Sequence, residues 1–62
     1  MHIGEGIEWV RCERMMSQRE LAERIGVKRY VISEIETGQR EPTKSILRDI
    51  CNVLDVDESD LA

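Results

Sequence analysis

The side chains best equipped for specific polar contacts lie on one side of the segment from Val27 to Glu36. Its apolar residues recur at the spacing of one buried helix face, at Val27, Val31, Ile32 and Ile35. The opposite face is polar or amphipathic and consists of Lys28, Arg29, Tyr30, Ser33 and Glu34. A planar guanidinium can bond two acceptors at once, and a carboxylate can accept from amino groups. An ordinary solvated helix shows the same outer pattern, so spacing alone leaves both interpretations open.

Charge is distributed unevenly along the 62 residues, which carry a net charge of −4. Positions 11 to 48 contain all nine basic residues and six acidic ones, a net charge of +3, whereas residues 1–10 carry −2 and residues 49–62 carry −5. This asymmetry predicts one positive face and an acidic back, and such a molecule can still orient on a nucleic acid. We expect weaker and more salt-sensitive binding than a uniformly basic domain would show.

The elements that must position the polar face are predicted to be helices. Only two residues are aromatic, and no run alternates apolar with polar residues for long, so no strand is expected. The spacing of Ile3, Ile7 and Val10 predicts a first helix from about residue 3 to Met15. Glycines at positions 4 and 6 weaken its first turn, and Met16 is expected to turn inward at its end.

A helix, a tight turn and a second helix follow. Ser17 and Glu20 have the spacing of a reciprocal capping box, which predicts a helix over about residues 17–25. Gly26 supplies the positive φ that a sharp turn requires. The helix that carries the polar face then extends over about residues 28–36.

Turn and cap signals also organise the rest of the chain. Gly38 fits a left-handed cap at the end of the third helix, and Pro42 precedes a fourth helix that starts at Thr43. Asp57 is expected to cap a short final turn that ends in Leu61. The sequence therefore predicts an all-α fold with four to five helices in a single domain over residues 1–62.

The pattern of these signals is that of a known family. It is carried by Ser17, Gln18, Arg19, Glu20, Leu21, Ala22, Gly26, Val27, Ile32, Ser33, Ile35, Glu36, Gly38 and Pro42. The chain resembles the Cro/repressor-type (XRE) helix-turn-helix family over nearly its whole length. The resemblance implies a compact lambda-repressor-like DNA-binding domain. Cys51 stands where alanine is usual, and Asp55 where glycine usually ends the fourth helix; Asp55 can still adopt a left-handed conformation.

The resemblance implies that the third helix is a recognition helix in the major groove of double-stranded DNA. Its base-contacting positions fall on Arg29, Tyr30 and Glu34, and we add Ser33. Arg29 can bond both acceptors of a guanine edge, and Glu34 can accept from a cytosine amino group. Tyr30 can pack on a thymine methyl group or reach a phosphate, with an amphipathic side chain lying over the helix surface as the alternative.

A second set of residues is expected to contact phosphates. Free amides at the start of the second helix favour an anion beside Ser17 and Gln18, and the loop after the recognition helix follows the backbone by resemblance. The expected phosphate contacts are Ser17, Gln18, Lys28, Gln39, Arg40, Thr43 and Lys44. The alternatives are a solvated first-turn residue for Gln18 and a plain surface loop for the segment after the recognition helix.

Two further expectations concern architecture and assembly. By resemblance, Arg11 and Glu36 form a partly buried ion pair between the first and third helices. Trp9 lies off the apolar stripe, so we expect it to be partly exposed, either as a lone surface aromatic or as a dimer contact. Two-fold DNA sites require two-fold proteins, and we expect a weak homodimer that forms mainly on a palindromic operator.

Other classes of protein lack the residues that they require. The one histidine, His2, has no nucleophile to pair with, and no glycine-rich loop could cradle a phosphate, so an enzyme is not expected. One histidine and two cysteines are too few for a zinc cluster or a disulfide framework. We expect no cofactor, metal or small-molecule ligand. Cys12 and Cys51 are expected to be reduced thiols, with a bridge between them as the alternative, and their redox role is left open.

The function that these observations predict is sequence-specific DNA binding by a small, repressor-like transcriptional regulator. No stretch approaches the roughly 18 apolar residues of a membrane span, and residues 1–10 lack the order of a signal peptide. A cytoplasmic protein without membrane association is therefore expected. The alternative is a protein-interaction module of the same fold, such as an antitoxin-like or partner-binding subunit with little DNA binding, which the net negative charge favours.

Overall fold

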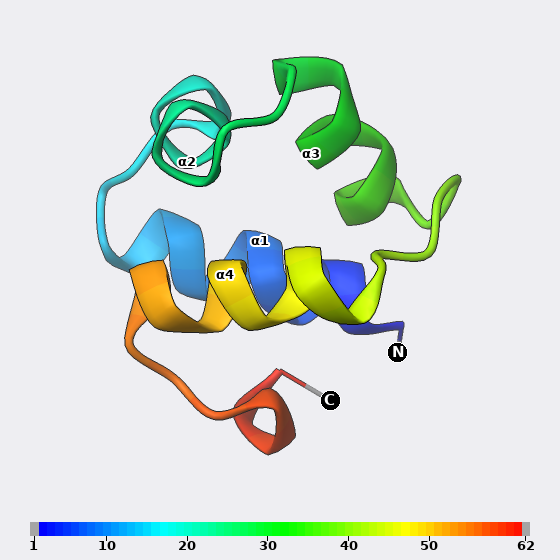
Figure 1. Ribbon diagram of the computed structural model, residues 1–62. Coiled ribbons are helices and arrows are strands. Elements are labelled where there is room, and N and C mark those ends of the chain that lie inside the picture. Colours follow the sequence, from blue (N-terminus) through cyan, green and yellow to red (C-terminus); the bar gives the residue numbers. More distant parts are fainter. Residues whose placement is uncertain (1, 62) are drawn as a thin grey trace.

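Helical periodicity along most of the chain produces a helical molecule. A computed structural model describes residues 2–61 and confirms the predicted all-α class, because no strand occurs in that range. Its elements are α1 (Ile3–Glu13), α2 (Gln18–Ile25), α3 (Arg29–Thr37), α4 (Lys44–Leu54) and a 3₁₀ turn, η1 (Glu58–Asp60). Figure 1 shows α2 and α3 on one side, α1 and α4 next to them, and η1 beyond α1 and α4. Among the described helices, none has both the length and the apolar character to cross a membrane.

One apolar core joins all five elements. The largest fully buried side chains are Ile7, Leu21, Ile32, Ile35, Ile50, Leu54 and Leu61. Burying each of them contributes about 1.5 to 3 kcal/mol relative to an exposed side chain. Because two of the seven lie on α3, the inner side of that helix is fixed in the core and its outer side is presented to solvent.

Helix starts and left-handed caps agree with the sequence predictions. The hydroxyl groups of Ser17 and Thr43 cap α2 and α4 by accepting from backbone amides three residues later, at 2.9 and 3.1 Å. Gly26, Gly38 and Asp55 adopt left-handed conformations with φ of 78°, 85° and 58°. These residues end α2, α3 and α4 and set the short connections between helices.

Two local predictions need correction. α1 ends at Glu13 rather than Met15, because the chain turns there and Met15 takes a φ of 55° with 93% of its surface exposed. This turn still directs Met16 into the core, as expected. The capping box at α2 is half formed: the Glu20 carboxylate accepts from Arg24 one turn later, at 2.9 Å, instead of reaching back to the backbone of Ser17.

The two glycines of α1 have a packing role that the sequence did not reveal. A Cβ atom on Gly4 would collide with the backbone carbonyl oxygen of Ile35, and one on Gly6 would collide with that of Leu61. Glycine at these positions therefore lets α1 approach α3 and the end of the chain closely. The loss of helix propensity in the first turn is the cost of that approach.

Candidate nucleic-acid interface

The third helix presents the polar face that its sequence predicts. Lys28 is the N-cap residue of α3, and Arg29 is its first helical residue. Lys28, Arg29 and Tyr30 are exposed, Tyr30 to 58% of its surface, whereas Ser33 and Glu34 are half-buried. Because the opposite side of α3 is buried, this face can meet a partner without rearrangement of the core. All five predicted residues are thus together on one helix surface.

A network that the sequence did not predict joins this face to the loop that follows it. Arg40 places both Nε and Nη2 at 2.8 Å from Oε1 of Glu34. The guanidinium carbon also lies 5.9 Å from the centroid of the Tyr30 ring, within the range of a cation–π contact. The left-handed turn at Gly38 brings Arg40 back onto α3, and the backbone amides of Gln39 and Arg40 both donate to the carbonyl oxygen of Glu34.

The start of α2 contacts the ion pair between α1 and α3. Gln18 is half-buried, and its Nε2 donates to Oε1 of Glu36 at 2.9 Å. The sequence predicted a phosphate contact for Gln18 and did not reveal this hydrogen bond. An amide nitrogen carries two hydrogens, so Gln18 can bond Glu36 and still donate outward. This hydrogen bond holds the Gln18 side chain, at the start of α2, against Glu36 of α3.

The expected partners Arg11 and Glu36 meet in a bidentate ion pair. Nε of Arg11 donates to Glu36 Oε2 at 2.7 Å, and Nη2 donates to Oε1 at 3.0 Å. Nη1 of Arg11 donates to the backbone carbonyl of Met16 at 2.7 Å. The hydrogen bond with Glu36 raises the pKa of Arg11 above its usual value, and burial opposes that shift. The pair connects α1 to α3 and contacts the start of α2 through the hydrogen bond between Gln18 and Glu36.

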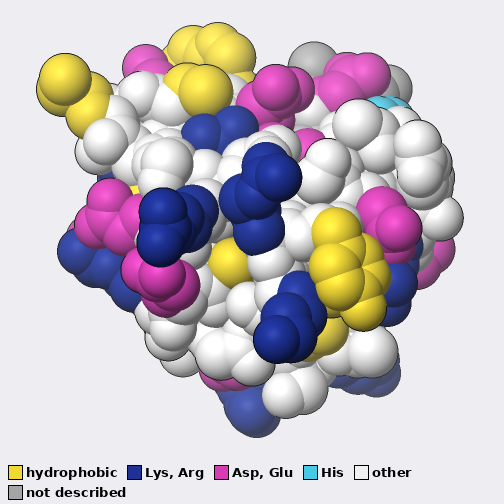
Figure 2. All heavy atoms as spheres, turned by 90° about the horizontal axis from the view of Figure 1, so that it is seen from above, with side chains coloured by type: hydrophobic (Ala, Val, Ile, Leu, Met, Phe, Trp, Pro, Cys, Tyr) yellow, Lys and Arg dark blue, Asp and Glu magenta, His cyan; other side chains and the backbone are white. Residues whose placement is uncertain are grey.

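The remaining residues that were expected to contact phosphates lie at the start of α2, after α3 and at the start of α4. Ser17, Gln39, Arg40, Thr43 and Lys44 are all exposed. Thr43 and Lys44 lie at the start of α4, where free amides and the helix dipole favour an anion. Figure 2 views the side formed by α2 and α3, where Lys and Arg side chains cross the middle and several carboxylates lie around them. The face therefore offers cations and helix N-termini around the exposed side of α3.

The two cysteines lie on α1 and α4 rather than on α3. Cys12 is exposed, Cys51 is half-buried, and both are free thiols, so the alternative of a bridge between them does not hold. Burial raises the pKa of Cys51, and the nearby carboxylates of Glu58 and Asp57 add to this shift. Within residues 2–61, no group of three or more His, Cys, Asp and Glu side chains is placed to hold a metal ion.

Comparison with known sequences links this geometry to one family. A sequence model described as helix-turn-helix matches residues 7–61. The HTH-type transcriptional regulator y4dL of Sinorhizobium fredii is 39% identical over 56 residues, which cover 90% of this chain and 29% of that protein. The HTH-type transcriptional regulator YqaE of Bacillus subtilis is 33% identical over 52 residues, which cover 84% of this chain and 45% of that protein. The chain therefore spans less than half the length of either relative.

Two solved structures share the arrangement of the helices. The clp gene regulator ClgR of Corynebacterium glutamicum superposes with a TM-score of 0.91 at 29% identity, covering 95% of this chain and 63% of that one. The restriction-modification controller protein C.AhdI of Aeromonas hydrophila superposes with a TM-score of 0.90 at 25% identity, covering 97% and 91%. The described helices therefore follow the same path as those of a gene regulator and of a restriction-modification controller protein.

Proposed function

Because the chain belongs to the helix-turn-helix family, of the Cro/repressor (XRE) type that its sequence resembles, we propose that it binds double-stranded DNA sequence-specifically and regulates transcription. The observation that carries this proposal is α3, whose inner side is fixed in the core while Lys28, Arg29 and Tyr30 are exposed. The proposed role is regulatory rather than enzymatic, and it is carried out on DNA in the cytoplasm.

In the proposed complex, α3 lies in the major groove with its first turn nearest to the bases. Arg29 bonds a guanine edge through two N–H groups, which contributes about 1 to 3 kcal/mol of discrimination against another base. Tyr30 packs beside a thymine methyl group, and Ser33 lies one turn further along the same side of the helix. The exposure of Arg29 and Tyr30 supports these roles.

Glu34 and Arg40 act together in this proposal. Arg40 donates to Oε1 of Glu34. In the part of the chain that the structure describes, no hydrogen bond reaches Oε2 of Glu34. Oε2 can therefore accept from the amino group of a cytosine. Arg40 also offsets the repulsion between the Glu34 carboxylate and the phosphates, so we assign Arg40 both a phosphate contact and a positioning role.

Phosphate contacts surround the recognition helix and set its register. The residues proposed for this role are Ser17, Gln18, Lys28, Gln39, Arg40, Thr43 and Lys44. Neutral groups and helix N-termini hold the domain in place, and each cation releases counterions from the DNA. Lys44→Ala should therefore weaken binding to all sequences alike. The binding constant should also fall less steeply with salt, with the magnitude of the slope of log K against log salt reduced by about one.

A palindromic operator is the proposed target, and a weak homodimer that forms mainly on DNA is the proposed complex. Recognition helices of such dimers meet half-sites about 10 bp apart. Sedimentation of the protein with a two-fold site measures the stoichiometry directly. Strictly monomeric protein on such a site would contradict the dimer.

Selection from a pool of randomised duplexes at about 150 mM salt tests the main proposal, because this ionic strength suppresses purely electrostatic binding. Enrichment of a short palindrome is expected. A folded protein that retards no duplex and enriches no sequence would refute DNA binding. That outcome would favour a protein-interaction module, which the net charge of −4 also suits.

A charge-matched pair of variants tests the role of α3. Arg29→Ala should weaken binding to the selected operator about tenfold or more and relax the preference at one base pair. Arg14→Ala removes the same charge from an exposed position at the end of α1, outside the proposed interface. It should keep the base preferences of the parent. Equal effects of the two substitutions would show that Arg29 contributes only charge.

A double-mutant cycle separates the two roles of Arg40. If Arg40 positions Glu34, Arg40→Ala should change the preference at the base pair that Glu34 contacts, and this change should vanish in a Glu34→Gln background. If Arg40 is only a phosphate contact, it should weaken all sequences equally in both backgrounds. If the parent protein selects an operator but the cycle shows no coupling, only the positioning role of Arg40 is wrong. If the parent protein selects no operator, the proposed function itself is wrong.

A further inference from the structure

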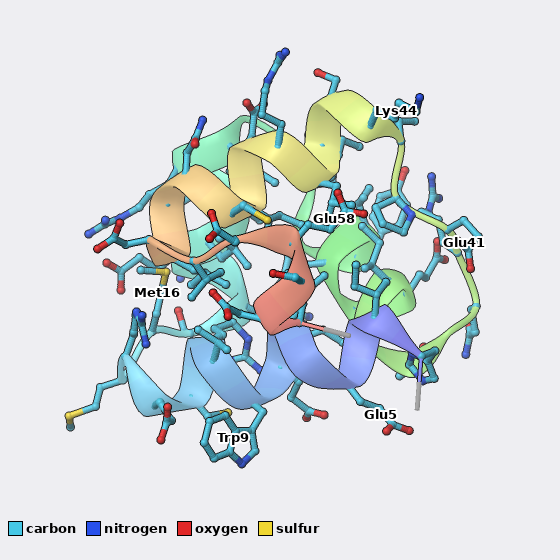
Figure 3. All side chains as sticks on the ribbon, turned by 90° about the horizontal axis from the view of Figure 1, so that it is seen from below. Glu5, Trp9, Met16, Glu41, Lys44 and Glu58 are labelled. Carbon is cyan, nitrogen blue, oxygen red and sulfur yellow. The ribbon has the colours of Figure 1, made fainter. Side chains whose placement is uncertain are left out.

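The single tryptophan lies in a groove that the proposed DNA contacts do not use. We call the Trp9 groove the depression between α1 and η1 whose lining includes Trp9, Val10, Leu61, Arg14 and the carboxylates of Glu5, Glu13 and Asp60. Val10 and Leu61 are buried and form its apolar floor, whereas 64% of the Trp9 surface is exposed. Figure 3 shows Glu5 and Trp9 projecting from α1 on the side away from α4.

The rim of the Trp9 groove is acidic. Glu5 and Glu13 lie one helical turn before and one after Trp9, so their side chains flank it on α1. Asp60 of η1 is a third exposed carboxylate, and Arg14 is the one cation among the residues that line the groove. The groove thus combines a large apolar contact with a negative potential.

We propose that the Trp9 groove binds a basic segment of a partner protein, with an apolar side chain of that segment packed against Trp9. Aromatic anchors contribute much of the energy of protein interfaces, and the face of a tryptophan ring also attracts Lys and Arg side chains. Cations that flank the apolar anchor would meet the carboxylates of Glu5, Glu13 and Asp60. This interaction goes beyond DNA binding and requires none of the residues assigned to DNA.

Charge also decides against the other possible occupants. A second copy that docked by the same face would bring the rim carboxylates against their own copies, and like charges across an interface are unfavourable. Nucleic acids and anionic membrane surfaces would meet the same repulsion. A basic protein segment is the occupant that satisfies both the apolar floor and the acidic rim.

The absence of a second tryptophan in the sequence makes the proposal testable by fluorescence. The probes are two synthetic amphipathic helical peptides with the same leucine stripe, one with lysine and the other with glutamate at the polar positions. The lysine peptide should bind, shift the emission of Trp9 to shorter wavelength, and lose affinity as salt rises. The glutamate peptide should not bind and should leave the emission of Trp9 unchanged. Equal responses to both peptides, or binding of the lysine peptide without a change in Trp9 emission, would overturn the proposal.

Charge reversals locate the site. Glu5→Lys combined with Glu13→Lys should weaken binding of the lysine peptide about tenfold. Glu23→Lys reverses an exposed carboxylate on α2, away from the groove, and should retain parental affinity. If each reversed charge lowered the affinity by the same factor in both variants, the peptide would sense only total charge and the site would be refuted. A blue shift that grows with protein concentration in the absence of peptide, and disappears in high salt, would show that a second copy occupies the groove instead.

Discussion

Replacing Glu36 with alanine removes the carboxylate on which three helices converge. Glu36 of α3 accepts from Nε and Nη2 of Arg11 on α1 at 2.7 and 3.0 Å, and from Nε2 of Gln18 on α2 at 2.9 Å. Side-chain exposure is 10% for Arg11 and 2% for Glu36. Glu36 is the main cause of the raised pKa of Arg11, and burial opposes that rise, but a guanidinium stays protonated in proteins even when its partner is removed. Glu36→Ala therefore leaves a charged group buried without its counter-ion.

Breaking a buried ion pair by removing one partner costs about 3 to 5 kcal/mol. A domain of this length is stabilised by about 3 to 9 kcal/mol in total. The substitution should therefore remove about a third or more of the free energy of unfolding. In a domain of this size each kcal/mol lowers Tm by about 4 to 8 °C, so we expect a decrease of at least about 12 °C or loss of the folded state.

Thermal and urea unfolding followed by far-UV circular dichroism measure this loss. Glu23→Ala, at an exposed position of α2, is the matched control and should change stability by less than about 0.5 kcal/mol. The double variant Arg11→Met with Glu36→Leu leaves no unpaired charge, so it should be more stable than Glu36→Ala. If Glu36→Ala melts together with the Glu23→Ala control, the ion pair contributes nothing and the reasoning is refuted.

Two further predictions concern α1 and the thiols. Gly6→Ala should destabilise the fold by about 1 to 3 kcal/mol in urea unfolding, because its Cβ would displace the backbone of Leu61. Gly26→Ala meets no neighbouring atom and should lose only the roughly 1 kcal/mol of left-handed strain; an equal loss in both would argue against the close approach. A disulfide reagent near pH 8 should modify exposed Cys12 before Cys51, since the raised pKa of Cys51 leaves less thiolate; comparable rates in the two single serine variants would contradict this. A raised folded-state pKa also means that Cys51 favours the folded state below its usual pKa and loses that contribution as alkaline pH rises, which urea unfolding against pH measures.

Features set by a few neighbouring residues could be predicted from the sequence. The hydroxyl cap at Ser17 and the left-handed turns at Gly26 and Gly38 depend on local backbone geometry, whereas the turn at Asp55 was expected from the family pattern. Helix periodicity likewise identified which side of the third helix is buried. Family resemblance supplied the expectation that Arg11 and Glu36 meet, because 25 positions separate them and no local rule joins them.

Contacts between elements were decided only by the tertiary structure. The sequence interpreted the glycines of α1 as weak helix formers, because the backbone carbonyls that they approach come from distant parts of the chain. It assigned Gln18 and Arg40 to phosphates, but it did not reveal their contacts with Glu36 and Glu34. Likewise, only the packing of η1 beside α1 turned an exposed Trp9 into one wall of a groove.

The sequence by itself thus determined which helices form, where they begin, which side of each is apolar and, except for α1, where they end. These properties follow from caps, turns and periodicity within about one or two helical turns. The tertiary structure decided which polar side chains meet, because hydrogen bonds and ion pairs depend on distances of a few tenths of an ångström between separate elements. For Glu34 and Arg40, that distance depends on the path that the chain takes after Gly38.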